Sequence, residues 1–191
     1  MTTAETEAAA TETDVTRAEV CVVACAEIFR DAGEIAALTR MVRPHVAVVT
    51  WVGGSHVEHF ADGEVGIARA KAEIFEGVEP GGWAVWPYDN AHAAILKAAI
   101  EKAGLQSLSF GWSADADVHV LRADIGAAGT ELVADVAGEE VHCRIGMAGR
   151  HWVSNALAVL VIAKWEHKFD RKKALAYERE VLGRFDKTAD R

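Results

Sequence analysis

The apolar run at residues 45–52 is followed by four residues whose side chains are suited to acid–base or metal chemistry. His56, Glu58 and His59 stand close together, and Lys71 follows on an expected helix. Imidazole and carboxylate groups bind metal ions, and imidazole also exchanges protons near neutral pH. The same spacing suits surface or hydrogen-bonding side chains, because a metal site needs a third ligand from elsewhere and a lone lysine is usually exposed.

The three cysteines give a weaker indication of chemistry. Cys21 and Cys25 lie on one face of an expected strand, which fits either two small buried side chains or half of a metal site. No second pair follows them, since the third cysteine, Cys143, stands alone. The odd count also argues against a disulfide framework. We therefore favour the buried side chains.

The elements that must position these residues are indicated by the apolar pattern. Buried-type strands are expected at residues 18–29, 45–52, 81–90 and 107–111, with helices at 32–42, 63–78 and 91–104. This alternation is typical of a parallel α/β sheet. Residues 115–147 instead alternate at period two, with glycine-containing turns, and predict an antiparallel meander. The predicted fold class is α/β: a mostly parallel sheet flanked by helices, plus the meander.

Both ends of the chain differ from its middle. Residues 1–16 are rich in Thr, Ala and Glu and predict a disordered acidic tail, and residues 17–163 form the α/β domain, which closes with an apolar helix at 151–165. Residues 164–191 predict a charged amphipathic helix with apolar positions at Phe169, Leu175, Val181, Leu182 and Phe185. Its charges are mixed in sign, which favours a solvated helix with one docking stripe over membrane binding.

Composition excludes several classes of function. The 191 residues carry a formal net charge of -9, which argues against a surface that binds nucleic acid. No apolar run approaches the ~20 residues that cross a bilayer, and the start lacks the basic and apolar regions of a secretory signal. We therefore expect a cytoplasmic protein with neither a membrane span nor a nucleic-acid partner.

The order of the segments resembles the central domain of the Mur ligase family. The resemblance depends on "ARAKAEIFEG" at residues 68–77 and on "GRH" followed by "NAL" at residues 149–157, with "HVEHF", "DN" and "SFG" at matching places between 56 and 111. It covers about Gly33 to Leu160. Such a resemblance implies an ATP- and magnesium-dependent enzyme that forms amide bonds in peptidoglycan precursors.

The resemblance also implies a magnesium site. In the family, the lysine that matches Lys71 carries a carbamate, whose anionic oxygen is a ligand that Mg²⁺ prefers. The histidine that matches His56 serves the same metal. The metal-binding glutamate of the family falls at Ala26, and Glu27, one residue away, would reach the metal only if a bulge shifted the strand register.

Other positions relate to the nucleotide. The resemblance places Asp89 and Asn90 near the nucleotide and Asn155 on its adenine side. Trp51 and Trp152 stand where the family has asparagines, which suggests a filled pocket or a changed ligand. With Trp83, Trp86 and Trp112 they are candidate contact or pocket-filling residues, although core packing is the favoured explanation for most of them.

The glycine-rich loop G-x-x-G-K-T/S that holds ATP phosphates in the family does not occur in this sequence, and the tail in its place is acidic. Two functions stay open. The first is a degenerate, non-catalytic Mur-ligase-like domain that binds a protein partner or self-associates. The alternative is an ATP- and Mg-dependent amide ligase fragment that is active only with a partner chain. In either case we expect a homo-oligomer or a complex with another protein.

Overall fold

The computed structural model describes residues 22–25, 33–54, 57 and 60–166, and it describes side chains only for 33–54, 57 and 60–164 of these. The elements in chain order are β1 (Val22–Cys25), α1 (Glu34–Val42), β2 (Val46–Val49), α2 (Glu64–Ala72), the 3₁₀ helix η2 (Glu73–Gly77), β3 (Trp83–Pro87), α3 (Ala93–Ala103), β4 (Gln106–Gly111), β5 (Val118–Gly126), β6 (Gly129–Val136), β7 (Glu140–Ile145) and α4 (Arg150–Glu166). The predicted acidic tail and most of the predicted C-terminal helix lie outside this description, so those boundaries stay predictions.

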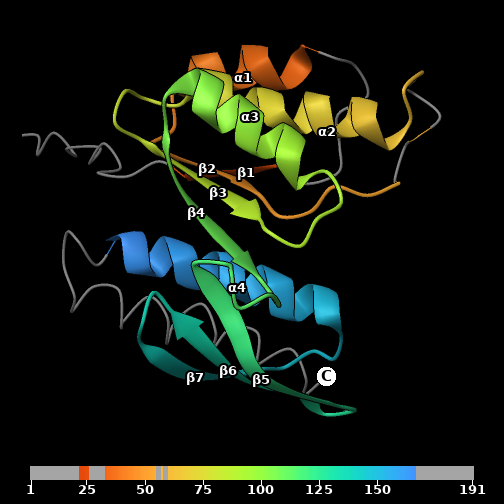
Figure 1. The fold of residues 1–191 in the computed structure, drawn as a ribbon, viewed down its shortest axis with the longest axis vertical. Coiled ribbons are helices and arrows are strands. Elements are labelled where there is room, and N and C mark those ends of the chain that lie inside the picture. The colour runs from red at the N-terminus through yellow and green to blue at the C-terminus, as the bar shows by residue number, and fades with distance from the viewer. Residues whose placement is uncertain (1–21, 26–32, 55–56, 58–59, 167–191) are drawn as a thin grey trace, which may run out of the picture.

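One seven-stranded sheet runs in chain order from β1 to β7. Strands β1 to β5 pair in parallel, and β5, β6 and β7 pair antiparallel. Figure 1 shows α1, α2 and α3 on one face of the parallel strands and α4 on the other. The predicted α/β class, with a parallel sheet and an antiparallel meander, is therefore confirmed.

Strand β2 shows why the parallel part is buried on both faces. All four of its residues are buried, as expected for a parallel strand covered by helices on either side. Val46 and Val48 join the apolar cluster that includes α4, whereas Ala47 and Val49 join the cluster beneath the other three helices. The alternation of side chains along one strand thus connects two cores.

The meander wraps around α4. In Figure 1, this helix lies between the parallel strands and the β5–β6–β7 part of the sheet. Its side chains Val153, Leu157 and Val161 are fully buried and belong to the same cluster as Leu132 and Val136 of β6. The chain turns from β4 into β5 in a short loop, which is possible because the two parallel strands pair over only two residues.

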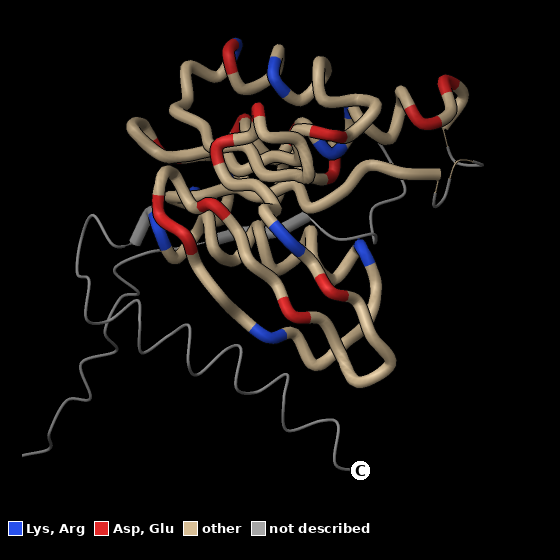
Figure 2. The backbone as a smooth tube through the Cα atoms, turned by 60° about the horizontal axis from the view of Figure 1, so that its bottom comes forward, with Lys and Arg blue, Asp and Glu red and all other residues tan. Residues whose placement is uncertain are grey.

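Charge is distributed over the described surface in both signs, with acidic and basic positions intermixed on helices and strands (Figure 2). Within the described residues, no helix is long and apolar enough to cross a membrane.

Candidate functional site

Lys71 is held by the chain segment that follows β2. It lies near the end of α2, and its Nζ donates a hydrogen bond to the carbonyl oxygen of Trp51 over 2.8 Å. The amine thereby connects the helix to the carboxyl end of a central strand. A magnesium ligand must present an oxygen, whereas this nitrogen acts as a donor to the backbone.

Glu73, two residues after Lys71, caps a different helix. Its two carboxylate oxygens accept hydrogen bonds from the backbone N–H of Gly33 over 2.8 and 2.9 Å, and one of them also accepts from Ala36 over 3.3 Å. Gly33 is the N-cap of α1, with φ 91. Because it is a glycine, it supplies no capping side chain of its own. The orphan N–H groups at this helix start are therefore satisfied by a carboxylate from η2.

The rest of the "EIFEG" segment packs the same junction. Ile74 and Phe75 are each 1% exposed and fill the core beneath α2 and α3. Glu76 forms an ion pair with Arg40 of α1 over 2.5 Å. Gly77 passes so close to the α1 backbone that a Cβ there would overlap Thr39. Glu73, Glu76 and Gly77 thus contact α1, and Ile74 and Phe75 pack the core next to them.

Asn90 organises the turn after β3. Its Nδ2 donates to the carbonyl oxygen of Val52 over 2.8 Å, and its Oδ1 accepts the N–H of His92 over 3.0 Å. Asn90 is 5% exposed, so both ends of the amide are used inside the protein. His92 continues the network, because its Nε2 lies 3.1 Å from a carboxylate oxygen of Glu64 at the start of α2.

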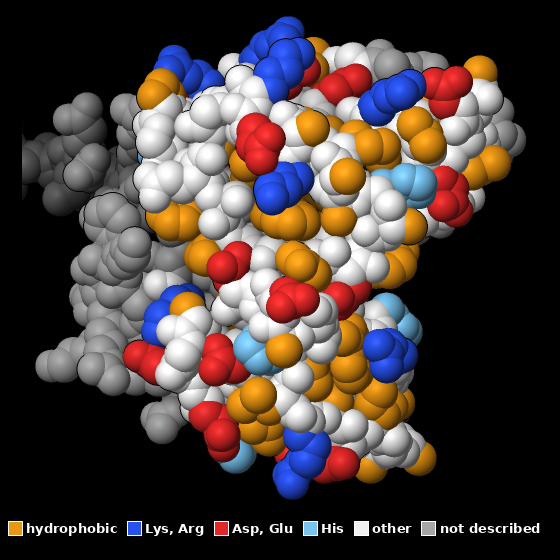
Figure 3. Space-filling view, in the orientation of Figure 1, with side chains coloured by type: hydrophobic (Ala, Val, Ile, Leu, Met, Phe, Trp, Pro, Cys, Tyr) orange, Lys and Arg blue, Asp and Glu red, His pale blue; other side chains and the backbone are white. Residues whose placement is uncertain are grey.

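A cavity of about 750 Å³ opens at the carboxyl ends of β2, β3 and β4. In Figure 3 the surface is hollowed on the right, between the helical layer and the half with the antiparallel strands. The first turns of α4 close its other side. Its lining residues are Thr50, Trp51, Pro87, Asp89, Phe110, Gly111, Trp112, Arg150, His151, Ser154 and Asn155. Its size is that of a small-molecule site, and ligands gather at this edge of parallel sheets.

Asp89 fixes the loop at the cavity floor. Its carboxylate accepts backbone N–H groups from Trp112, in a very short hydrogen bond, and from Ser113 over 3.2 Å. It also lies against Gly111, where a Cβ would collide with it. The carboxylate that the resemblance placed near the nucleotide is therefore occupied with the backbone after β4.

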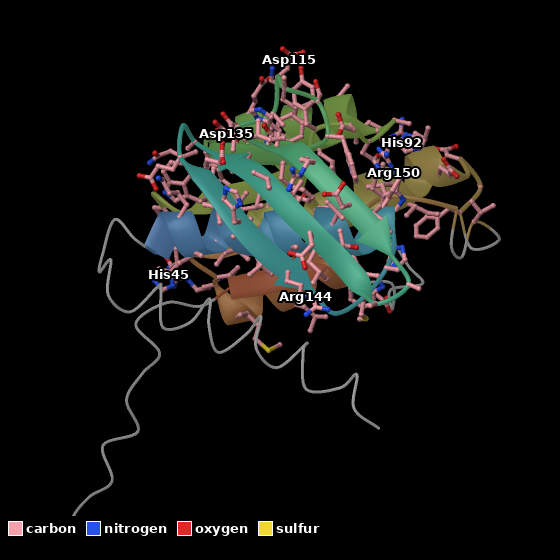
Figure 4. The ribbon with its side chains drawn as sticks, turned by 90° about the horizontal axis from the view of Figure 1, so that it is seen from below. His45, His92, Asp115, Asp135, Arg144 and Arg150 are labelled. Carbon is pink, nitrogen blue, oxygen red and sulfur yellow. The ribbon has the colours of Figure 1, made fainter. Side chains whose placement is uncertain are left out.

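Arg150 and Trp112 line the cavity together and contact each other. The guanidinium carbon lies 3.7 Å from the centre of the indole ring, in cation–π geometry. Figure 4 shows Arg150 on the same side of the molecule as His92. Trp51, 51% exposed, also lines the cavity. The cavity is thus flanked by two indoles and one cation.

The tryptophans divide between packing and cavity. Trp86 is buried among the residues beneath α2 and α3, and Trp83 and Trp152 pack on the cluster that includes α4. Trp152 is not among the residues that line the cavity, so the suggestion that it fills a pocket or meets a changed ligand stays a prediction. Trp51 lines the cavity, and an open space of about 750 Å³ lies beside it.

The predicted site residues are brought together only in part. Asp89 and Asn155 line the same cavity, while Lys71 and Asn90 face the backbone of the segment after β2. His56 and Glu27, predicted at the metal, lie outside the described residues, as do Glu58 and His59. Among the residues that the structure does describe, no group of three or more His, Cys, Asp or Glu could hold a metal ion. Lys71 donates to the backbone and Asp89 accepts from it, and the magnesium site with His56 and Glu27 stays a prediction.

Comparison with protein families gives the class to which this fold and cavity belong. The model of the Mur ligase middle domain matches residues 2–163, so the chain belongs to that family. It is a Mur ligase-like domain from the family of peptidoglycan-precursor ligases, whose members use ATP and magnesium. The resemblance stated from the motifs is therefore confirmed.

The relatives are longer proteins. The chain is 29% identical over 131 residues to the UDP-N-acetylmuramoyl-tripeptide–D-alanyl-D-alanine ligase of Escherichia coli, covering 69% of this chain and 28% of the ligase. A 73-residue stretch is 62% identical to the proton/glutamate-aspartate symporter of Escherichia coli, covering 37% of this chain and 17% of the symporter. The chain thus spans less than a third of the length of either relative.

Solved structures agree on the fold. MurF from Acinetobacter baumannii superposes with a TM-score of 0.65 at 24% identity, over 83% of this chain and 32% of that one. MurF ligase from Thermotoga maritima, in complex with ADP, gives a TM-score of 0.62 at 18% identity, over 76% of this chain and 39% of that one. At these identities the likeness establishes the architecture.

Reasoning from the sequence named Trp112 as a candidate contact residue but missed Arg150 and Glu73. Arg150 belongs to the "GRH" segment that carried the resemblance, so its place near a ligand site had a signal in the sequence. The contact between Trp112 and Arg150 had no such signal, because it joins residues far apart in the chain. The same holds for Glu73, whose backbone partner Gly33 lies 40 residues away.

Proposed function

We propose that this chain is a non-catalytic member of the Mur ligase family, whose role is to bind a protein partner, and foremost a second copy of itself. One observation carries the proposal. The charged side chains of the segment "ARAKAEIFEG" make structural hydrogen bonds. Lys71 donates to the Trp51 carbonyl, and Glu73 accepts from the backbone at the start of α1. Retention of this motif therefore needs no chemistry to explain it.

The geometry around Lys71 supports the proposal. In a carbamate, the new carboxylate would be an acceptor beside the Trp51 carbonyl, which is an acceptor too. Two acceptors repel unless a cation lies between them, and among the described residues no group of three or more His, Cys, Asp or Glu could hold a metal ion. The free amine, in contrast, donates to this carbonyl directly.

The sequence supports the proposal because it contains no phosphate-binding loop. Phosphoryl transfer depends on positioning and charge neutralisation of the phosphates, and a loop of the G-x-x-G-K-T/S kind supplies both. No such loop occurs in these 191 residues. Arg150 faces the cavity, but its guanidinium is stacked on Trp112.

The second candidate function is an amide ligase fragment that uses ATP and magnesium together with a partner chain. The cavity favours it, because an open space of about 750 Å³ at the strand ends is kept beside Asp89 and Asn155. In that case the partner would bring the phosphate loop. This candidate requires that nucleotide binding depend on Lys71.

Calorimetric titration separates the two functions. MgCl₂ and Mg-ATP are titrated separately into the full chain, its Lys71→Ala variant and a Lys97→Ala control on the exposed face of α3. The proposal expects the same heat from all three proteins with both titrants. Saturable binding that Lys71→Ala abolishes and Lys97→Ala retains would overturn it in favour of the ligase fragment.

A further inference from the structure

Strand β7 forms one edge of the sheet. It pairs with β6 on one side, and within the described residues no strand pairs with it on the other. An edge strand presents a row of unpaired backbone N–H and C=O groups that can template pairing with another chain. The direction of these groups follows from the β6–β7 turn.

The turn shows which residues of β7 face outward. Val136 and Glu139 exchange both backbone hydrogen bonds, over 2.8 and 3.4 Å, and close a two-residue hairpin. In an antiparallel ladder such pairs recur at every second residue, so Val141, Cys143 and Ile145 bond toward β6. The backbone groups of Glu140, His142 and Arg144 therefore point away from the sheet.

The side chains of these three residues carry opposite charges at the two ends of the strand. Glu140, His142 and Arg144 are on the solvent face, with side-chain exposures of 60%, 68% and 55%. The acid stands at one end of the strand and the base at the other. Figure 4 shows Arg144 and Asp135 at opposite ends of the β6–β7 hairpin, and Asp135 stands opposite Glu140 in the register. The end near Glu140 is thus acidic.

We propose that two copies of the chain join edge to edge through β7, antiparallel and centred on His142. In this register Glu140 stands across from Arg144 of the partner subunit, and Arg144 across from Glu140 of the partner subunit. His142 faces its own copy at the twofold axis. The three outward-bonding residues pair only with one another, which is what a continuous ladder requires.

Other registers of the same edge are disfavoured by charge. A parallel in-register pair would place Glu140 beside Glu140 of the partner subunit, and like charges directly opposite each other destabilise a sheet. An antiparallel pair shifted by two residues would leave Arg144 without a carboxylate across from it. Charges on edge strands usually discourage pairing, but this order of signs is complementary to itself.

The inner face of β7 supports the same pairing. Val141 and Cys143 pack against the cluster that includes α4 and are half-buried. In the proposed register Val141 stands across from Cys143 of the partner subunit, and Cys143 across from Val141 of the partner subunit. The apolar face of one sheet therefore continues into the next. The dimer would combine apolar contact on one face with ion pairs on the other.

This inference rests on the proposed function, since it names the surface by which the chain binds a second copy. Its test is sedimentation velocity of the full chain over a range of concentrations, with the variants Glu140→Arg, Arg144→Glu and the double exchange of both. Each single variant places like charges across both pairs and should weaken association about tenfold. The double variant restores the order of signs and should return to within about twofold of the starting chain.

A matched control addresses the pair within one chain. Arg144 also lies 3.4 Å from Glu131 on β6, and Glu131→Gln removes that pair without changing the edge. Association should be the same in this variant as in the starting chain. Circular dichroism of every variant checks that the fold is kept.

A monomer at all concentrations, or a dimer that the single charge changes leave unaffected, would overturn the β7 proposal. A monomer would also remove the second copy from the proposed function, whereas the absence of catalysis is tested separately by the Mg-ATP titration. Conversely, Lys71-dependent nucleotide binding would overturn the non-catalytic function and leave a charge-dependent dimer standing.

Discussion

Truncating Glu73 tests whether the segment that resembles the ligase motif serves to cap α1. In Glu73→Ala, the N–H groups of Gly33 and Ala36 lose their carboxylate acceptor at the start of α1. Loss of a helix cap costs about 0.5–2 kcal/mol, and the charge near the positive helix end contributes about 0.3–1 kcal/mol. We expect unfolding to become easier by about 1.5 kcal/mol, which lowers the Tm by roughly 3–6 °C in a domain of this size.

The assay is urea unfolding followed by circular dichroism, with Tm from the same signal. Glu73→Gln keeps one acceptor oxygen and should lose about half as much stability. The control is Glu76→Ala, since Glu76 makes only a surface ion pair with Arg40 and should change stability by less than about 0.5 kcal/mol. Equal stability of Glu73→Ala and Glu76→Ala would refute the capping role and with it the structural explanation of the motif.

Three further substitutions test the surrounding geometry by the same urea assay. Gly77→Ala should cost about 3 kcal/mol, because its Cβ would overlap the α1 backbone at Thr39, and an unchanged midpoint would contradict that close approach. Asp89→Asn should cost about 1 kcal/mol and change the near-UV signal of Trp112, whose N–H loses a charged acceptor; an unaltered spectrum would count against this. Lys71→Ala should cost no more than about 1 kcal/mol, the worth of one hydrogen bond, and a larger loss would show that more contacts depend on the amine.

The fold could be predicted because its signals are local. The four residues of β2 are all apolar and those of β7 alternate at period two, so the local pattern indicates the type of each element. One detail differs, since the helix expected over residues 63–78 changes to a 3₁₀ helix at Glu73. The change coincides with the point where the Glu73 carboxylate turns to α1 and Gly77 approaches its backbone, both of which are tertiary contacts.

The site could be predicted only where the family motif reached it. Asp89 and Asn155 were expected near one ligand and line one cavity. The roles of Lys71 and Asn90 could not be read from spacing, because their partners are backbone carbonyl groups 20 and 38 residues away. A carbonyl is present at every residue, so the sequence carries no sign of which one a side chain will meet.

The chemical state of Lys71 is the most direct test of the central claim. The full chain and Lys71→Ala are incubated with ¹³C-bicarbonate and MgCl₂, and carbamate carbon is observed by ¹³C NMR without removing the label. We predict the same spectrum for both proteins, because the Lys71 amine donates to the Trp51 carbonyl over 2.8 Å. A carbamate resonance in the full chain that disappears in Lys71→Ala would contradict the account.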